Sequence, residues 1–312
     1  MSSFDSETQI REVPIYQPGP AMIKDGIQTV LDVIGTSEME SEYRDSVLVA
    51  IDFENTANFD KSTNLPIKDV QVGLAILDPT HLSSSTSSEH LIPTYNFVAG
   101  SAEYRRKAEL KFLFGKPVVI DHCHMLTSIM QCIPLGRKVL LVGHDIRHEI
   151  RILRQLKFDF SRFDITGSLD TFRIAQQVLP YFSLSLGELL TELQCPHNWL
   201  HNGGNEAHFT LRALLLLAER SCPGHVGINN NLSRAVAAAR LPMPHISPGE
   251  AEMIAQEQLT AARKREKKRT KRIKNTRKYQ SKSWGPEIIE QIRAGRAAKK
   301  LNKEKYRPIY GF

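Results

Sequence analysis

The sequence predicts an α/β protein with a mixed five-stranded sheet, in which three antiparallel strands are followed by parallel strands. Helices flank this sheet, and a basic C-terminal extension follows it. Two observations carry the prediction. The expected elements follow the order β-β-β-α-β-α-β-α, and parallel strands need helical crossovers of this kind. The runs at 47–51 and 138–142 are almost wholly apolar, which is typical of strands buried on both faces.

The individual elements follow from local composition. Asn-, Pro- and Ser-containing turns separate the first three strands. The strands are expected at residues 47–51, 70–77, 91–98, 138–142 and about 165–169. Helices are expected at 102–115, about 186–194 and 206–220. A further helix follows the fourth strand, because apolar residues recur at helical spacing at Ile146, Ile150, Leu153 and Leu156. Asp145 lies in the position of its N-cap.

The remaining segments divide the chain into regions of different character. Residues 1–45 are expected to be a partly ordered N-terminal extension with one amphipathic helix over 22–34. Residues 46–220 form the α/β domain. Proline and glycine mark 221–250 as a linker with one short helix, and 251–312 is expected to be a basic tail, helical or disordered.

The positive charge of the chain belongs to this tail. Residues 263–307 contain nineteen Lys and Arg and four Glu, a net charge of +15, so the rest of the chain is acidic although the whole carries +7. Such a run can neutralise phosphates of RNA or DNA, which makes binding strongly salt-dependent. The residues expected to bind nucleic acid are Arg263, Lys264, Arg265, Lys267, Lys268, Arg269, Lys271 and Arg272. The alternatives are a nuclear-localisation signal and a solvated run without a partner.

Composition argues against several other classes. The four cysteines show no Cys-x-x-Cys spacing, so they are expected to be reduced thiols of an intracellular protein in the nucleus, the cytoplasm or both. The segment 121–124 and the pair Cys195 and His197 have metal-binding residue types, but they lack a second paired motif and predict no zinc site. No apolar run approaches the ~20 residues that span a bilayer, so no membrane partner is expected.

The first acidic segment lies at the end of the first strand. Asp52 and Glu54 are two residues apart, and alternate residues of a strand point to the same side. Two carboxylates on one face repel each other unless a cation lies between them, and hard divalent cations prefer oxygen ligands. The alternative is a strand end with two ordinary surface acids.

The second and third segments add two acids and a histidine. Glu149 lies one turn into the helix that follows the fourth strand, so it projects near the strand end. Residues 202–205 are typical of a turn, with His201 before it and Glu206 at the start of the next helix. A histidine can take a proton from water near neutral pH. Alone, Glu149 would be a helix-surface acid and His201 an exposed loop residue.

Together the three segments resemble the motifs of the DEDDh exonucleases of the ribonuclease H-like superfamily. Asp52-Phe53-Glu54 matches the strand motif Asp-x-Glu. Residues 143–149 resemble the Gly-His-Asn-x-x-Phe-Asp type of helix start, and 201–207 resemble His-x-x-x-x-Asp-Ala. Asp170-Thr171 resembles the Asp-Thr that often opens a helix after a core strand in this superfamily. The resemblance covers roughly residues 46–220 and predicts a ribonuclease H-like sheet.

The resemblance extends to one subgroup. The strings at 142–149 and 201–207 are similar to those of a fungal group, named after a yeast factor called "good for full activity" of a DEAD-box helicase in messenger-RNA export. This similarity is the reason to expect a role in messenger-RNA metabolism.

The resemblance also implies a chemistry. Such proteins are 3′→5′ exonucleases that act on RNA or DNA with two Mg²⁺ or Mn²⁺ ions. The implied metal ligands are Asp52, Glu54, Glu149 and Glu206, with Asp52 shared by both ions. Glu54 and Glu206 would hold the ion that positions the attacking water, Glu149 would complete the shell of the other, and His201 would deprotonate the water.

This chain departs from the family pattern at two of the four acids. Glu149 and Glu206 stand where the family usually has Asp, and Mg²⁺ demands near-ideal octahedral geometry. Asn55 stands where many relatives have Thr. Three functions therefore stay open: an active exonuclease, a weakly active or inactive nucleic-acid-binding or adaptor protein with the same fold, and a protein-interaction module. The sequence identifies no protein partner.

Overall fold

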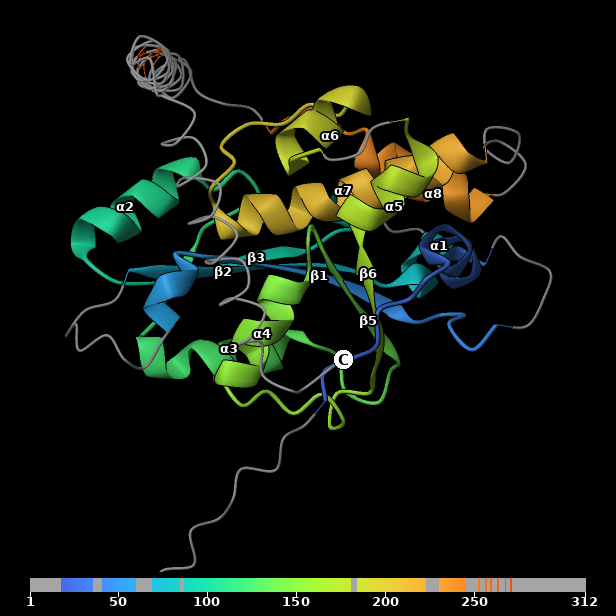
Figure 1. Ribbon diagram of the computed structural model, residues 1–312, viewed down its shortest axis with the longest axis horizontal. Helices are drawn as coiled ribbons and strands as arrows, with labels where there is room; N and C mark the ends of the chain where they lie inside the picture. Colours follow the sequence, from blue (N-terminus) through green and yellow to red (C-terminus); the bar gives the residue numbers. More distant parts are fainter. Residues whose placement is uncertain are drawn as a thin grey trace, which may run out of the picture. The chain divides into compact units, whose positions relative to one another are not determined.

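The computed structural model describes residues 18–35, 41–59, 69–84, 87–180, 184–222 and 230–244, together with six helical positions between Glu252 and Thr270 (Figure 1). The chain divides into two units, Met1–His245 and Ile246–Phe312. All of the sheet and the eight helices α1 to α8 belong to the first unit.

The described part of the chain forms one six-stranded sheet in the order β4-β3-β2-β1-β5-β6. The strands are β1 Val47–Glu54, β2 Val70–Leu77, β3 Thr94–Ala99, β4 Val118–Val119, β5 Val139–Gly143 and β6 Ile165–Asp170. β2 pairs antiparallel with both β1 and β3, whereas β1 with β5, β5 with β6 and β3 with β4 are parallel. The predicted mixed α/β fold is confirmed, because the sheet holds both kinds of pairing between layers of helices.

The number of strands needs correction from five to six. The five expected strands are present, and the extra one is β4 at the edge beside β3. Its two residues, Val118 and Val119, are 45% and 52% exposed. The apolar run Val118-Val119-Ile120 is shorter than the roughly four to eight residues by which a buried strand is recognised, so the sequence did not predict it.

Helices cover both faces of the sheet (Figure 1). They are α1 Gly26–Ile34, α2 Ala102–Lys111, α3 Met125–Cys132, α4 Arg147–Gln155, α5 Thr171–Val178, α6 Leu186–Glu192, α7 Gly203–Ser221 and α8 Asn230–Ala239. One hydrophobic cluster joins α1, α5, α6, α7 and α8 to one face of β1, and a second joins α3 and α4 to the other face. β1 is therefore buried on both faces, which explains its unbroken apolar run.

The alternation along β1 determines which way its acids point. Leu48 and Ala50 belong to the cluster under α7, whereas Val49, Ile51 and Phe53 belong to the cluster under α4. Because side chains alternate along a strand, residues 52 and 54 point to the same side as Leu48 and Ala50. Both acids thus lie on the α7 face of the sheet.

Helix boundaries differ from the sequence predictions at several ends. α2 ends at Lys111 rather than near 115, and α7 begins at Gly203, three residues early. The predicted N-cap at Asp145 is wrong, because α4 begins after Ile146. Asp145 has a φ of 62°, and its carboxylate instead accepts a hydrogen bond from Arg147 Nε at 2.8 Å.

The regions outside 46–220 also contribute to the first unit. α1, within the predicted N-terminal extension, buries Val30, Val33 and Ile34 in the cluster under α7. α8, within the predicted linker, buries Leu232 and Ala235 there as well. The domain boundaries themselves stay predictions.

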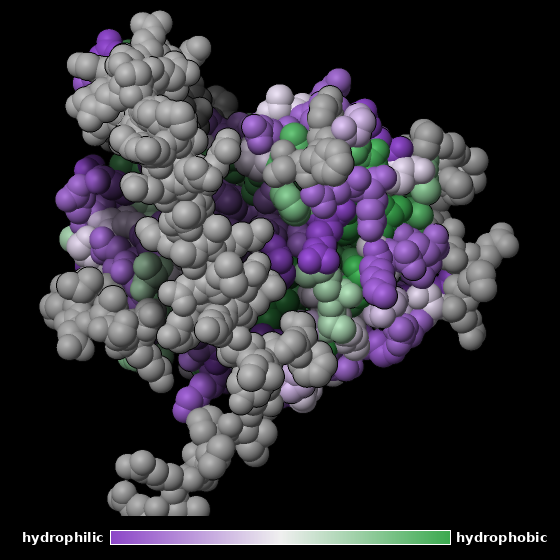
Figure 2. All heavy atoms as spheres, in the orientation of Figure 1, coloured by the Kyte–Doolittle hydropathy of each residue, from purple (hydrophilic) through white to green (hydrophobic). Residues whose placement is uncertain are grey.

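On the face shown in Figure 2, the described surface is mostly hydrophilic, with smaller hydrophobic areas between. A search of the described helices for one both long and apolar enough to cross a bilayer finds none.

Gly73 allows α7 to begin directly against the sheet. It is the register partner of Asp52 on β2, and a Cβ atom placed on it would lie 1.9 Å from the backbone oxygen of Gly203. The Gly203 oxygen and the Gly73 Cα are both main-chain atoms, so neither can move away without shifting the helix or the strand. The first turn of α7, which carries Glu206, therefore depends on this glycine.

Gly73→Ala is expected to lower the free energy of unfolding by about 1–3 kcal/mol, because overpacking forces the backbone apart. Urea unfolding of the purified variant measures this change. Gly187→Ala is the matched control: its Cβ would contact only the side chains of Leu200 and His197, and alanine favours a helix. Equal stability of Gly73→Ala and the wild type would contradict the close contact.

Candidate active site

The first two acids of the candidate site come from the end of β1. The side chains of Asp52 and Glu54 are half-buried, and Asp52 Oδ2 is shielded from solvent without a hydrogen-bond partner among the described residues. The backbone oxygen of Asp52 lies 3.2 Å from where a Cβ on Gly203 would be. β1 and the start of α7 are thus in direct backbone contact.

The start of α7 adds an acid and an imidazole. Asn202 caps the helix by accepting a hydrogen bond from Asn205 N, as capping residues do. The Glu206 carboxylate accepts a hydrogen bond of 2.6 Å from His201 N. Because His201 has a φ of 68°, the loop turns back onto the helix that it precedes.

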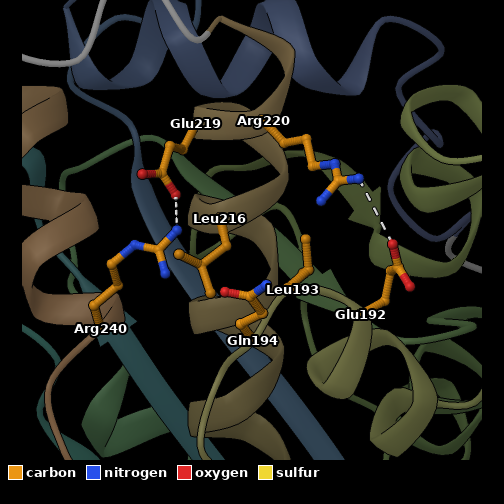
Figure 3. Close-up of a pocket in the computed structure, with 7 residues that line it drawn as sticks. All are labelled: Glu192, Leu193, Gln194, Leu216, Glu219, Arg220 and Arg240. Carbon is orange, nitrogen blue, oxygen red and sulfur yellow. Dashed lines mark hydrogen bonds and ion pairs between the residues drawn. The ribbon is translucent and has the colours of Figure 1, made fainter.

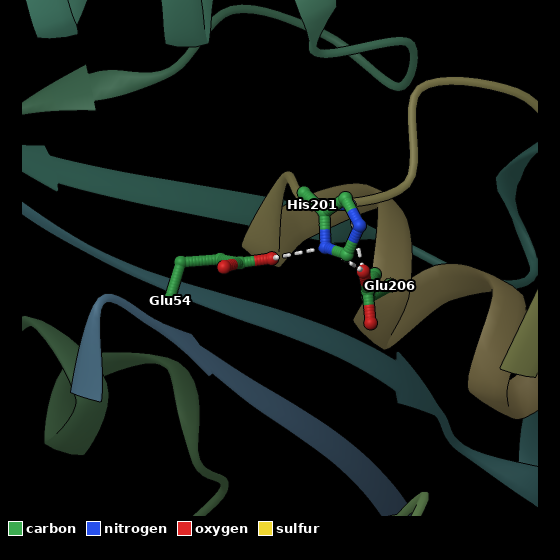
Figure 4. Close-up of side chains that lie close together, drawn as sticks. All are labelled: Glu54, His201 and Glu206. Carbon is green, nitrogen blue, oxygen red and sulfur yellow. Dashed lines mark hydrogen bonds and ion pairs between the residues drawn. The ribbon is translucent and has the colours of Figure 1, made fainter. Parts of the chain in front are cut away.

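His201 connects the two elements. Its Nδ1 lies 3.9 Å from a Glu54 oxygen and 3.6 Å from a Glu206 oxygen (Figure 4). The two carboxylates are only 21% and 19% exposed, whereas the imidazole is 89% exposed. An accessible base therefore lies over two largely buried acids.

The fourth acid comes from α4, in the first turn after β5. Glu149 is buried, and its Oε2 atom has no hydrogen-bond partner within the described part of the chain. Nearby, Asp170 caps α5 and also accepts a hydrogen bond of 2.9 Å from Asp145 N. This second hydrogen bond stabilises the turn between β5 and α4. That turn positions α4, which carries Glu149.

The pKa values show that the four predicted acids share one electrostatic environment. Burial raises the pKa of Asp52 well above its ordinary value, and the charges of Glu206, Glu54 and Glu149 raise it further. Burial and Glu206 raise the pKa of Glu54 to about 7. Burial, with smaller contributions from Asp145, Asp170 and Glu206, raises the pKa of Glu149 to about 8. The fold brings these acids together from β1, α4 and α7.

This donor set fits a divalent cation. Glu54, His201 and Glu206 each offer one ligand atom, and these atoms all lie within 4.8 Å of one another. Asp52 and Glu149 are outside that group of three, but each presents a buried carboxylate oxygen without a partner among the described residues. Clustered carboxylates with such oxygens are what Mg²⁺ and Mn²⁺ prefer. The assignment of individual ligands stays a prediction.

The structure adds two neighbours of the site that the sequence analysis did not name. The Tyr104 hydroxyl on α2 accepts hydrogen bonds of 3.0 Å from Asn55 and Gln71, directly beside Glu54. Tyr104 and Asn55 are far apart in sequence, so no local pattern signals their contact.

A second such neighbour is Trp199, two residues before His201. It has a φ of 50°, and its carbonyl accepts a hydrogen bond of 3.0 Å from Asn205. The Lys111 Nζ atom lies 5.1 Å from its ring centroid. Because Trp199 lies two residues before His201, the sequence alone could have indicated it as a residue of the site.

The predicted nucleic-acid-binding residues belong to the second unit. Arg263 and Lys267 are exposed helical positions. The other six, Lys264, Arg265, Lys268, Arg269, Lys271 and Arg272, lie outside the described residues. Their role stays a prediction.

Two comparisons with known proteins bear on this site. The uncharacterized protein YDR514C of Saccharomyces cerevisiae (strain ATCC 204508 / S288c) is 25% identical over 193 residues. That similarity covers 51% of this chain and 40% of the yeast protein, so the chain spans less than half the length of this relative. The family model described as "DNA polymerase III subunit epsilon-like, C-terminal domain" matches residues 47–217, which include all five predicted site residues. Because that match spans more than half of the chain, the protein belongs to this family of DEDDh exonuclease-like domains.

Proposed function

We propose that the protein is a metal-dependent 3′→5′ exonuclease that shortens RNA or DNA by phosphodiester hydrolysis. The observation that carries this proposal is the convergence of four acids and one accessible histidine at the junction of β1, α4 and α7. His201 Nδ1 lies 3.9 Å from a Glu54 oxygen and 3.6 Å from a Glu206 oxygen, and the charges of Glu54, Glu149 and Glu206 add to burial in raising the pKa of Asp52.

In this proposal the carboxylates of Asp52, Glu54, Glu149 and Glu206 hold two divalent ions. When bound, the ions neutralise charge on the scissile phosphate and activate water. Bound cations would let the acids stay close to one another at neutral pH, because they would replace the protons that burial otherwise retains. Asp52 is central among them, since each of the other three raises its pKa.

His201 accepts the proton of the attacking water. Its Nδ1 faces Glu54 and Glu206, which leaves Nε2 to act as the base. The hydrogen bond from its backbone N–H to Glu206 fixes the loop that carries it. Its high exposure leaves room for a substrate strand to approach.

The test is an assay on end-labelled single-stranded RNA and DNA with Mg²⁺ or Mn²⁺. Stepwise loss of nucleotides from the 3′ end of at least one substrate is expected. Because Glu149 and Glu206 are one methylene longer than Asp, the rate is expected to be higher in Mn²⁺ than in Mg²⁺. No shortening of either substrate in either metal would contradict the proposal.

Trp199 is placed to stack on a base of the substrate. Two residues of chain span at most ~7 Å, so its Cα lies within that distance of the Cα of His201. A bulky residue at positive φ is uncommon, and such strain is concentrated at functional sites. The ring is partly exposed and lies beside the Lys111 ammonium group, which suits a phosphate.

Trp199→Ala is therefore expected to weaken binding of a single-stranded oligonucleotide roughly 5- to 100-fold, the usual effect of losing one stacking platform. Fluorescence anisotropy in EDTA measures binding without cleavage, and about 0.3 M salt suppresses the contribution of the basic tail. Trp199→Phe, which keeps an aromatic face, is the matched control and should retain most of the affinity. Unchanged affinity of Trp199→Ala would rule out this role.

The second candidate function is a weakly active or inactive nucleic-acid-binding or adaptor protein with the same fold. The two Glu replacements and the basic segment 263–272 favour it. It predicts salt-dependent RNA binding that is lost on deletion of 251–312, with no shortening of the substrate. A role in messenger-RNA metabolism or export, and a location in the nucleus or cytoplasm, belong to this proposal and rest on the resemblance to the fungal group. The similarity to the yeast protein is in keeping with that resemblance.

A further inference from the structure

Arg212 on α7 is a buried cation without an acidic partner. The residue is only 2% exposed, and no carboxylate of the described residues lies within ion-pair distance of it. Charged side chains are almost never fully buried unless they are paired, because the loss of hydration is costly. A buried unpaired guanidinium is thus a feature that the fold alone does not account for.

A second cavity nearby contains two arginines that do have carboxylate partners. It has a volume of about 560 Å³ and contains Arg220 and Arg240 (Figure 3). Arg240 lies 2.6 Å from Glu219, and Arg220 lies 3.6 Å from Glu192. Each of these arginines has its carboxylate, although both are more exposed than Arg212.

The partners of Arg212 are all neutral. Its Nε donates to His208 Nε2 at 2.9 Å, and its Nη1 donates to the carbonyl of Leu241 at 2.9 Å. The nearby thiol of Cys195 is also neutral, because burial raises its pKa. A guanidinium has five N–H donors, so donors remain for a further acceptor.

The hydrogen bonds also fix His208 as a neutral imidazole. Since Nε2 accepts from Arg212, the proton must be on Nδ1, which lies 2.7 Å from the Thr94 hydroxyl. That hydroxyl in turn donates to the carbonyl of Ile92. Burial and the charge of Arg212 lower the pKa of His208 well below its ordinary value, which agrees with this assignment. His208 therefore neither neutralises Arg212 nor competes with it for an anion.

Arg212 and His208 line a cavity of about 410 Å³ between α7, η3 (Ser88–His90) and the segment after α8. We call it the Arg212 cavity. The Phe114 ring stacks on the His208 ring with centroids 3.6 Å apart, and Ile92 and Met243 add apolar wall. Apolar walls with a few polar groups are the usual composition of a small-molecule site, and the volume lies within the usual range.

We propose that the Arg212 cavity binds a small organic anion, with a carboxylate or phosphate on the Arg212 guanidinium and a planar or apolar body against Phe114, Ile92 and Met243. The ligand supplies the ion-pair partner that Arg212 lacks among the described residues. The cavity shares no lining residue with the five predicted residues of the candidate active site. This inference therefore does not depend on the proposed nuclease function.

The experiment is calorimetric titration of the full-length protein in EDTA with benzoate, phenyl phosphate and the neutral analogue benzyl alcohol. EDTA removes cations through which an anion could bind at the acidic site. At least one anion is expected to bind at least about tenfold more tightly than benzyl alcohol, because a hydrogen bond to a charged group has about this effect. The comparison of benzoate with phenyl phosphate decides between the two anionic groups.

Arg212→Met is expected to abolish anion binding, and Arg220→Met, which removes an arginine that has a carboxylate partner, should leave it unchanged. If Arg212→Met does not fold, Met243→Glu decides the matter, because a carboxylate on the cavity wall should also abolish binding. Glu89→Gln removes an exposed acid that lines the cavity and should strengthen binding. Absence of binding by both anions, equal binding of benzyl alcohol, or wild-type affinity in Met243→Glu would overturn the proposal.

Discussion

Replacing Asp52 with Asn is expected to reduce the rate of 3′→5′ cleavage by at least about a thousandfold while the protein remains folded. Asp52 is the acid whose pKa is raised by the charges of all three other predicted ligands, so it lies close to each of them. Loss of its charge removes the carboxylate proposed to be shared by both ions. Metal stabilisation of the transition state amounts to several kcal/mol, and each 1.36 kcal/mol is about a tenfold change in rate.

Single-turnover cleavage of an end-labelled oligonucleotide in Mn²⁺ measures this effect. Asp32→Asn on α1 is the matched control, because among the described residues its carboxylate accepts a hydrogen bond only from Gln28 on the same helix, and it lies outside the candidate site. That variant should cleave at the wild-type rate. If Asp52→Asn retained a tenth or more of the wild-type rate, Asp52 would have no metal-binding role in the reaction.

The metal-free protein is expected to lose about 1.5 kcal/mol or more of unfolding free energy between pH 6.5 and 8. The pKa of Glu149 is about 8 and that of Glu54 about 7 in the folded protein, both raised from 4.5. In this window the folded state holds protons that the unfolded state has already lost. Stability therefore falls as pH rises through the folded-state pKa values, by up to about 1.4 kcal/mol per pH unit for each proton.

The pH range starts at 6.5 because two histidines make the stability rise with pH, mostly below this value. Burial lowers the pKa of His144 and of His208, so the unfolded state binds more protons there and stability rises with pH. At pH 6.5 each histidine is about half protonated in the unfolded state and less protonated in the folded state. The two histidines therefore offset up to about 0.8 kcal/mol of the decline, and the carboxylates dominate.

Urea unfolding at pH 6.5, 7, 7.5 and 8 in EDTA, and again in Mn²⁺, checks this expectation. Glu149→Gln should flatten the decline in EDTA, since the amide does not titrate. Mn²⁺ should flatten it in the wild type, because the cation replaces the protons. A stability in EDTA that stays constant or rises over this range would contradict the raised pKa values.

Those parts of the fold that have a periodic pattern could be predicted from the sequence. β2 begins and ends at the predicted residues 70 and 77, because it is buried on both faces and bounded by polar turns. The two-residue strand β4 is too short for any period. The cap at Asp145 was wrong because a tertiary contact, the hydrogen bond from its N–H to Asp170, determines the turn.

The candidate site followed from the sequence only in part. The i, i+2 spacing of Asp52 and Glu54 predicts their common side, and the alternation of β1 places them on the α7 face. The proximity of Glu149 and Glu206 to this pair came from the resemblance, since no local pattern reports contacts between residues 50 to 150 positions apart. The same limit concealed Tyr104 and the lack of an acidic partner for Arg212, because the surroundings of both residues include segments distant in sequence.

The central claim is that the carboxylates of β1, α4 and α7 form one divalent-cation site. Anomalous diffraction from crystals soaked in Mn²⁺ tests it most directly, because it locates the ions independently of any activity. We predict two peaks about 3.5–4 Å apart, in contact with Asp52 and shared among Glu54, Glu149 and Glu206. A well-ordered crystal with no peak at these four carboxylates would contradict it.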